Sequence, residues 1–194
     1  MAHKFEPKNW ERLISEERRQ LLDPENALDL IGVPQGIRVA DVGAGPGFFT
    51  LPLASRVGAA GRVDALDVSP EMVEILRSRR LPPQVYVQLS DEHTLPLPDA
   101  VVDLVLLAFV FHELEDRERF LGELTRVLRP GGRLAVIDWV PRAETIGPPE
   151  KERVAEVEVV SALRATNFHV SDRRQMNDSQ YLVIASPVGH PGAA

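Results

Sequence analysis

Residues 39–49 read Val39-Ala40-Asp41-Val42-Gly43-Ala44-Gly45-Pro46-Gly47-Phe48-Phe49, and a further apolar segment continues to Val57. An apolar run of strand length, 37–42, meets three closely spaced glycines there, and 48–57 has the pattern of a helix. Glycine lets the backbone turn sharply and approach a ligand without a Cβ in the way. The start of a helix offers backbone N–H groups to polar or negative groups. The segment therefore predicts a strand, a ligand-binding turn and a helix; a tight turn without a ligand is the alternative.

Apolar runs of strand length alternate with amphipathic segments in the rest of the chain. Upstream we expect one helix over 9–22 and a second that Asp23-Pro24 opens and Gly32 ends. Downstream we expect strands at 62–68, 85–89, 101–110 and 133–139, helices that start at Ser69 and after Asp116, a helix from Pro148 to about Thr166, and an antiparallel hairpin from 168–173 and 181–186. This alternation predicts an α/β fold with a doubly wound, mostly parallel sheet. Ligands of such sheets bind at the carboxyl ends of the strands.

The composition is that of one globular domain that uses no thiol chemistry. The 194 residues include 22 Lys and Arg and 29 Asp and Glu, a formal net charge of −7. This acidic balance argues against a nucleic-acid partner. The chain has no cysteine, which excludes disulfides, thiolate zinc sites, iron–sulfur clusters and a cysteine nucleophile. No apolar run approaches the roughly 18 residues of a membrane span and no secretory signal precedes Trp10, so we expect a cytoplasmic protein without a membrane span.

One carboxylate stands at the end of the second predicted strand. Asp67 lies 20 residues after Gly47. A carboxylate in this place commonly accepts hydrogen bonds from both ribose hydroxyls of an adenosine cofactor. The alternative is that Asp67 caps the helix that begins at Pro70, but Ser69 is better placed for that cap. We therefore expect Asp67 to bind a ribose.

The spacing of the glycines separates two kinds of adenosine cofactor. Dinucleotide-binding loops follow the pattern G-x-G-x-x-G, whose third glycine would fall at position 48, which is Phe48. The observed order is G-x-G-x-G, with Asp41 two residues before the first glycine. S-adenosylmethionine has no pyrophosphate, so its loop needs to accommodate only an amino-acid moiety. The spacing therefore leaves an NAD(P)-dependent oxidoreductase as the weaker alternative.

Four segments together resemble one enzyme family. Residues 39–49 resemble motif I of the class I S-adenosylmethionine-dependent methyltransferases, whose consensus is close to (V/L)-D-x-G-x-G-x-G. Residues 90–99 are similar to the segment after the family's third strand, 103–113 to its fourth-strand motif, and 128–134 to its turn before the fifth strand. The four segments span 36–139 in the expected order. Within the family, the chain is similar to the small-molecule enzymes grouped with the ubiquinone/menaquinone C-methyltransferases (methyltransferase domain 11-like).

The resemblance implies a Rossmann-like fold with seven strands, the last of them antiparallel. Around this sheet we expect N-terminal helices and a C-terminal antiparallel hairpin. We expect a single methyltransferase domain over 1–194, with a helical cap (1–35), a cofactor-binding core (36–140), a C-terminal helix and hairpin (141–186) and a frayed tail (187–194).

The activity that the resemblance implies is methyl transfer from S-adenosylmethionine to a small-molecule acceptor by in-line displacement. The attacking atom is oxygen, carbon or nitrogen, and the product of the cofactor is S-adenosylhomocysteine. A non-catalytic protein that binds S-adenosylmethionine is the alternative. The chain is expected to act as a monomer or a homodimer.

The same resemblance assigns the cofactor contacts. The glycine loop 43–47 surrounds part of the cofactor and is supported by Asp41, and Asp91 approaches the adenine amino group. Ala108 lies next to the cofactor after the fourth strand. The full set of implied cofactor-binding residues is Asp41, Gly43, Ala44, Gly45, Gly47, Asp67, Val68, Asp91, Glu92, which adds a backbone contact, and Ala108.

His112 is the candidate catalytic residue. A position just after the fourth strand is expected to face the methyl group, and an imidazole accepts a proton near neutral pH. The alternative is that His112 only hydrogen-bonds the backbone where the strand ends. Glu113 and Asp138 are expected to form a polar cluster with it. These residue types bind divalent ions, but their spacing fits no strong ligand motif, and we expect no metal.

The N-terminal segment carries an apolar stripe of Trp10, Leu13 and Ile14 at helical spacing. The interpretation that we favour is that the stripe packs on the sheet. The alternative is a movable lid that closes a substrate cavity and excludes water.

Overall fold

The structure is a computed structural model that describes residues 7–144 and 146–189. These residues form two compact units: the N-terminal unit ends at Pro96 and the C-terminal unit begins at Leu97. A single domain over the whole chain stays a prediction. Residues 190–194 of the predicted tail lie outside the described residues.

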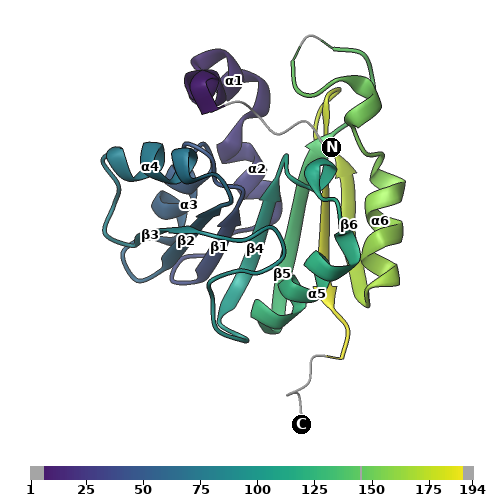
Figure 1. Cartoon of the computed structure of the whole chain (residues 1–194). Helices are drawn as coiled ribbons and strands as arrows, with labels where there is room; N and C mark the ends of the chain where they lie inside the picture. The colour runs from purple at the N-terminus through teal and green to yellow at the C-terminus, as the bar shows by residue number, and fades with distance from the viewer. Residues whose placement is uncertain (1–6, 145, 190–194) are drawn as a thin grey trace. The chain divides into compact units, whose positions relative to one another are not determined.

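The N-terminal unit contains three parallel strands and the helices around them (Figure 1). Strand β1 pairs with β2, with Val39 opposite Val63, and β2 pairs with β3, with Val63 opposite Val85. Helix α3 packs on β1 and β2, and α4 packs on β2 and β3. In chain order the elements are η1 (Pro7–Ile14), α1 (Glu16–Leu22), α2 (Pro24–Ile31), β1 (Arg38–Val42), α3 (Thr50–Val57), β2 (Arg62–Asp67), α4 (Pro70–Ser78) and β3 (Val85–Leu89).

The C-terminal unit contains four strands, of which β7 alone runs against its neighbours β5 and β6 (Figure 1). Strands β4 and β5 are parallel, and helix α6 packs on the hairpin of β6 and β7. In chain order the elements are β4 (Val102–Ala108), η2 (Phe111–Glu113), α5 (Arg117–Val127), β5 (Leu128–Trp139), η3 (Glu150–Glu152), α6 (Glu156–Ala165), β6 (Phe168–Gln175) and β7 (Gln180–Pro187).

The seven strands have the order β3-β2-β1-β4-β5-β7-β6. The predicted seven-stranded, mostly parallel sheet with a C-terminal antiparallel hairpin and N-terminal helices is therefore confirmed. Strand β4, predicted as a strand buried on both faces, has fully buried aliphatic side chains at Leu104, Val105, Leu106 and Leu107. Such burial suits a run of branched side chains without polar alternation.

Side-chain caps explain where several helices begin. The Asp23 carboxylate accepts a hydrogen bond from the N–H of Asn26 and opens α2, which ends at Gly32 with φ +67°. The Ser69 hydroxyl caps α4, and the Asp116 carboxylate caps α5. These caps satisfy backbone N–H groups that have no partner inside the helix. The predicted starts of these three helices are confirmed.

Two helical predictions are wrong in their extent. Residues 9–22 form the 3₁₀ helix η1 and the helix α1 rather than one helix, because Ser15 is extended and caps α1. Residues 148–166 likewise contain η3 and, after the extended residues Arg153 and Ala155, the separate helix α6. In both segments the helical spacing of apolar residues continues across residues whose backbone is extended, so the spacing alone does not reveal the break.

Strand β5 and helix α3 also begin at other residues than predicted, and β4 ends at Ala108 rather than at residue 110. Strand β5 begins at Leu128 rather than Arg133, because Leu128 pairs with Val102 and the register then jumps to Arg133 opposite Leu104. Residues 129–132 fill this bulge, with Gly131 at φ +78°. Helix α3 begins at Thr50 rather than Phe48, since the turn of the glycine loop continues through Phe49.

Across residues 7–144 and 146–189, no helix is both long enough and apolar enough to cross a membrane.

Candidate active site

The glycine loop, residues 43–47, is held at the ends of β1 and β2 by backbone hydrogen bonds. The N–H groups of Gly43 and Ala44 donate to the carbonyl of Leu66, at 2.8 and 3.0 Å. The N–H of Gly47 donates to the carbonyl of Ala44 at 2.9 Å. Gly43, Gly45 and Gly47 all have positive φ, at 72°, 52° and 89°. A left-handed backbone of this kind costs glycine nothing and strains other residues, which explains the spacing of the glycines.

Asp67 joins the glycine loop to the start of α4. Its Oδ2 accepts the N–H of Gly45 at 2.7 Å, and its Oδ1 accepts the N–H of Ser69 at 2.9 Å. The hydroxyl of Ser69, and not Asp67, accepts from the N–H of Met72 and caps α4. Burial raises the pKa of Asp67 above its ordinary value, although the hydrogen bonds from Ser69 and Gly45 oppose this shift. The carboxylate is thus fixed at the loop, and the helix does not need it as a cap.

Asp41 supports the loop from below, inside the protein. It is buried in β1, and its Oδ2 accepts a hydrogen bond from the Thr50 hydroxyl at 2.6 Å. Thr50 is the first residue of α3, so this bond ties the strand before the loop to the helix after it. Burial raises the pKa of Asp41 to about 7; the hydroxyl of Thr50 opposes the shift and the charge of Asp67 adds to it.

Gly47 marks a close approach between the loop and α4. A Cβ at this position would lie 2.6 Å from Cδ1 of Leu76. The guanidinium of Arg79 also donates a hydrogen bond to the carbonyl of Pro46. Helix α4 therefore packs directly on the loop, and Gly47 is required for that packing as well as for its φ.

The predicted adenine-side residues follow β2 and β3. Val68 is 43% exposed beside Asp67. The N–H of Ser90 donates to the carbonyl of Asp67 at 2.9 Å, which brings the segment after β3 to the same end of the strands. Asp91 and Glu92 are exposed there, and the N–H of Asp91 donates to the carbonyl of Thr94. Their contacts with a cofactor stay predictions.

The N-terminal helices contact the glycine loop and α4. A Cβ on Gly45 would lie 3.9 Å from Cδ1 of Leu13 in η1, and η1 also packs against α4. The guanidinium carbons of Arg18 and Arg19 lie 5.6 and 5.9 Å from the ring centroid of Phe48. This places η1 and α1 at the loop. Packing of the apolar stripe on the sheet, and its alternative as a movable lid, both stay predictions.

In the C-terminal unit, His112 pairs with Asp138. His112 lies in η2, shortly after Ala108 ends β4, and its side chain is 7% exposed. Its Nδ1 lies 2.8 Å from Oδ1 of Asp138, and its backbone N–H donates to Oδ2 at 3.1 Å. Oε1 of Glu113 lies 3.9 Å from Nε2. The predicted cluster of His112 with Asp138 and Glu113 is therefore present, and the contact of His112 is to a side chain rather than to backbone alone.

Charge around His112 favours the protonated ring. Burial lowers the pKa of His112, but the hydrogen bond and charge of Asp138 and the charges of Glu113 and Glu152 outweigh it, so the pKa is raised overall. Among the described residues, no group of three or more His, Cys, Asp or Glu side chains is arranged to hold a metal ion. The imidazole is thus placed to take up a proton.

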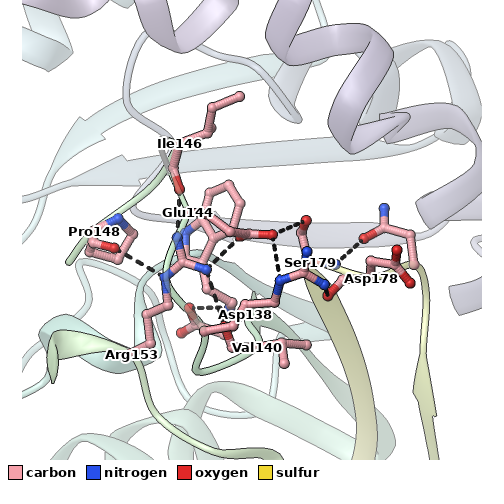
Figure 2. Close-up of polar contacts among 11 residues, drawn as sticks. Asp138, Val140, Glu144, Ile146, Pro148, Arg153, Asp178 and Ser179 are labelled. Atoms are coloured by element: carbon pink, nitrogen blue, oxygen red, sulfur yellow. Dashed lines mark hydrogen bonds and ion pairs between the residues drawn. The ribbon is translucent and has the colours of Figure 1, made fainter. Parts of the chain in front are cut away.

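A second polar network surrounds Arg153, as Figure 2 shows. The fully buried guanidinium donates to the carbonyls of Val140, Ile146 and Pro148 and to Glu144 Oε2, the last at 2.6 Å. These bonds hold together much of the segment between β5 and α6. This network could not be predicted from the sequence, because Arg153 stands among other charged residues there and no motif marks it.

Ser179 and Arg142 complete the contacts of Glu144. The Ser179 hydroxyl donates to its Oε1 at 2.7 Å, and Nε of Arg142 lies 3.0 Å from the same oxygen. Arg153 holds the pKa of Glu144 below its ordinary value against the effect of burial, and Ser179 and Arg142 add to this lowering. The guanidinium of Arg153 also lies over the ring of Trp139, with its carbon 5.1 Å from the ring centroid. A buried cation therefore anchors the end of β5, next to Asp138.

A protein-family model and two curated relatives that match this chain are all methyltransferases. A family model described as a methyltransferase domain matches residues 40–136. A demethylmenaquinone methyltransferase from Tropheryma whipplei is 37% identical over 122 residues, which are 63% of this chain and 50% of that protein. A ubiquinone/menaquinone biosynthesis C-methyltransferase from Idiomarina loihiensis is 32% identical over 116 residues, 58% of this chain and 46% of that protein. The chain spans about half the length of these curated relatives.

One solved structure matches almost the full length of this chain. The crystal structure of a SAM dependent methyltransferase from Aquifex aeolicus has 36% sequence identity and a TM-score of 0.90. The match covers 95% of this chain and 100% of that one. The fold, the glycine loop and the family model therefore agree with one another.

Proposed function

This chain belongs to the methyltransferase domain family, among the class I enzymes related to the ubiquinone/menaquinone C-methyltransferases, and we propose that it transfers a methyl group from S-adenosylmethionine to a small-molecule acceptor. The observation that carries the proposal is the junction of Asp67 with the Gly45 N–H at 2.7 Å. It brings a carboxylate and a glycine loop together at the carboxyl ends of parallel strands, where such sheets bind ligands.

The residues at this junction fit an adenosine cofactor. Oδ2 of Asp67 accepts the N–H of Gly45 and Oδ1 accepts that of Ser69, the N–H of Val68 adds a smaller backbone contact, and carboxylate oxygens have further lone-pair capacity for other donors. Two ribose hydroxyls match this remaining capacity. Val68 beside it is 43% exposed and offers an apolar side chain to a flat base. The glycine loop has no side chain at positions 43, 45 and 47 that would obstruct the amino-acid part.

The roles in the N-terminal unit follow from these contacts. When bound, the cofactor supplies an electrophilic methyl group on a sulfonium. Asp67 orients the ribose, the loop 43–47 accommodates the amino-acid moiety, and Asp41 keeps the loop attached to α3 through Thr50. We assign Asp91, Glu92 and Ala108 to the adenine side and the methyl side of the cofactor as the family resemblance implies. Orientation of two reactants in this way is worth roughly 7–11 kcal/mol of the barrier.

We assign the role of general base to His112, in the C-terminal unit. An oxygen or carbon nucleophile loses a proton as it attacks the methyl carbon, so a nearby base accelerates the step. The imidazole of His112 is held by Asp138 and has a raised pKa, which favours proton uptake. A cytoplasmic location, a monomeric or homodimeric state and the absence of a nucleic-acid partner stay predictions from the sequence.

The test of the proposed function is a calorimetric titration of the full chain with S-adenosylmethionine, S-adenosylhomocysteine and NADH in parallel. We expect micromolar binding of the two sulfur ligands and no binding of NADH. Binding of NADH alone would overturn the assignment of the cofactor.

A non-catalytic protein that only binds S-adenosylmethionine would give the same titration. Formation of S-adenosylhomocysteine in the presence of any acceptor from a small-molecule panel separates the two, because a binding protein forms none. Screening O-, C- and N-nucleophiles in that panel also identifies the attacking atom.

A further inference from the structure

Asp138 is a buried carboxylate beside His112 in the C-terminal unit. It is 0% exposed, and three N–H or imidazole groups surround it. Oδ1 accepts the N–H of Trp139 at 2.8 Å and lies 2.8 Å from Nδ1 of His112. Oδ2 accepts the backbone N–H of His112 at 3.1 Å. One carboxylate therefore fixes both the backbone and the ring of a residue 26 positions away.

These contacts decide which nitrogen of His112 carries the proton. Both oxygens of Asp138 already accept backbone N–H groups, and an ionised carboxylate can only accept hydrogen bonds. Nδ1 must then be the donor in its contact with Oδ1. The neutral ring therefore has its proton on Nδ1 and its lone pair on Nε2, because the hydrogen bond of one ring nitrogen fixes the state of the other.

We propose that Asp138 is a positioning residue, which holds His112 in the Nδ1–H form so that Nε2 is the proton acceptor during methyl transfer. This role rests on the proposed function. The acceptor atom forms its bond to the methyl carbon with its own electron pair, and the electrons of the sulfur–methyl bond stay on sulfur. The proton of the acceptor goes to Nε2, and the imidazolium later releases it to solvent.

The charges that face His112 suit this role. They come from three elements: Asp138 in β5, Glu113 in η2 and Glu152 in η3. All three are carboxylates that stabilise the imidazolium formed when Nε2 takes a proton. Asp138 contacts Nδ1, whereas Oε1 of Glu113 lies 3.9 Å from Nε2. Loss of Asp138 or of Glu113 lowers the pKa of His112, but only loss of Asp138 removes the preference for the Nδ1–H tautomer.

A strained residue supports the same geometry independently. Phe109 has φ +63°, a conformation that is costly for a bulky side chain and persists only where the surroundings impose it. Its N–H donates to the carbonyl of Ile137 at 2.7 Å, and its ring lies 4.7 Å from that of Trp139. Ile137 and Trp139 flank Asp138 in β5. The turn that leads to His112 is thus held by the two neighbours of the carboxylate that holds its ring.

The test reads the tautomer directly, in the full chain labelled with ¹⁵N and without any ligand. Long-range ¹H–¹⁵N spectra of the imidazoles are recorded as a function of pH, and the His112→Gln variant assigns the His112 signals. In the wild-type protein we expect the proton of the neutral ring on Nδ1. A proton on Nε2 would overturn the proposal.

Two variants separate positioning from charge. Asp138→Asn removes the anionic partner of Nδ1, so the pKa of His112 should fall and the preference for the Nδ1–H form should be lost. Glu113→Gln is the matched control: the pKa should fall, but the Nδ1–H form should persist, because the contact with Asp138 is intact. A purely structural role of Asp138 would move neither the tautomer nor the pKa in a folded variant, and this result would contradict the proposal.

Two further measurements keep the result interpretable. If Asp138→Asn does not fold, the wild-type tautomer and the Glu113→Gln titration still decide the question. Calorimetry of the wild-type sample with S-adenosylhomocysteine tests the proposed function separately. Absence of binding would contradict methyl transfer and leave the tautomer result standing, whereas binding with the wrong tautomer would contradict only the role of Asp138.

Discussion

The glycine loop of the N-terminal unit and the polar networks of the C-terminal unit are built in different ways. In the loop, backbone N–H groups donate to the Leu66 carbonyl and to Asp67, and two side chains add clamps: Thr50 on Asp41 and Arg79 on the Pro46 carbonyl. In the C-terminal unit, side chains from distant parts of the sequence hold one another: His112 and Asp138 are 26 residues apart, and Ser179 and Glu144 are 35 apart.

This difference explains why the sequence reveals the glycine loop and not the polar networks. A loop made from backbone needs positive φ at fixed positions, so it leaves glycines at a fixed spacing. A network of side chains needs only that a donor meets an acceptor in space, and such residues look like surface charges until the fold brings them together. Four substitutions test whether the two regions also differ in how much stability or ligand binding they lose.

The largest effect is expected in the Arg153 network. Arg153→Ala removes the buried cationic partner of Glu144 and the donor to three backbone carbonyls. Removing one member of a buried ion pair costs about 3–5 kcal/mol. We expect the free energy of unfolding, measured with urea, to fall by this amount.

Arg142→Ala is the matched control, since Arg142 contacts the same Glu144 but is 48% exposed. An exposed pair is worth about 0–1 kcal/mol. Equal losses in the two variants would show that the buried position of Arg153 does not matter.

The second effect concerns the buried carboxylate under the glycine loop. The pKa of Asp41 is about 7 in the folded protein and 3.8 is its ordinary value. A raised carboxyl pKa stabilises the fold fully below about pH 4, and this contribution is lost as the pH rises through about 7. At about 1.4 kcal/mol per pKa unit, the loss reaches up to about 4 kcal/mol.

Asp41→Asn should remove this dependence, because asparagine does not titrate and its amide oxygen still accepts from Thr50. Urea unfolding of both proteins between pH 4 and 7 measures it. The wild-type stability should fall relative to the variant as the pH rises; parallel curves would contradict the raised pKa.

The third effect is on ligand binding rather than stability. Asp67→Ala removes two proposed ribose hydrogen bonds, and charge-assisted bonds are worth roughly 2–4 kcal/mol together. Calorimetry with S-adenosylhomocysteine should therefore show a much weaker complex. Glu71→Ala is the control, since Glu71 is an exposed carboxylate on α4 that contacts Ser69. Unchanged affinity of a folded Asp67→Ala protein would remove Asp67 from the site.

The smallest effect separates two glycines of one loop. Gly47→Ala places a Cβ 2.6 Å from Leu76 and also strains a residue with φ +89°, so we expect a loss of about 2–3 kcal/mol of stability. Gly45→Ala has φ +52° and only an ordinary 3.9 Å contact with Leu13, so its loss should be about 1 kcal/mol. Thermal unfolding compares the two. Adding Leu76→Val should recover part of the loss at Gly47 and none at Gly45.

Much of the glycine loop and its surroundings in the N-terminal unit was predictable from sequence. The strand, the glycine loop and the cap at Ser69 depend on local rules, and the structure confirms each of them. The position of Asp67 at the end of β2 also follows from its place in the sequence. The split of 9–22 into η1 and α1 was not predicted, because the apolar stripe continues across the break at Ser15.

The sequence by itself determined the alternation of strands and helices, the glycine loop and the family, because these depend on residue spacing along the chain. Only the tertiary structure decided that Asp138 reaches both the ring and the backbone of His112, that Arg153 is a buried cation, and that Phe109 has a left-handed backbone. The physical reason is that side-chain hydrogen bonds and backbone strain depend on which strands become neighbours and in which register. The local spacing of residues along the chain predicts neither these hydrogen bonds nor this strain.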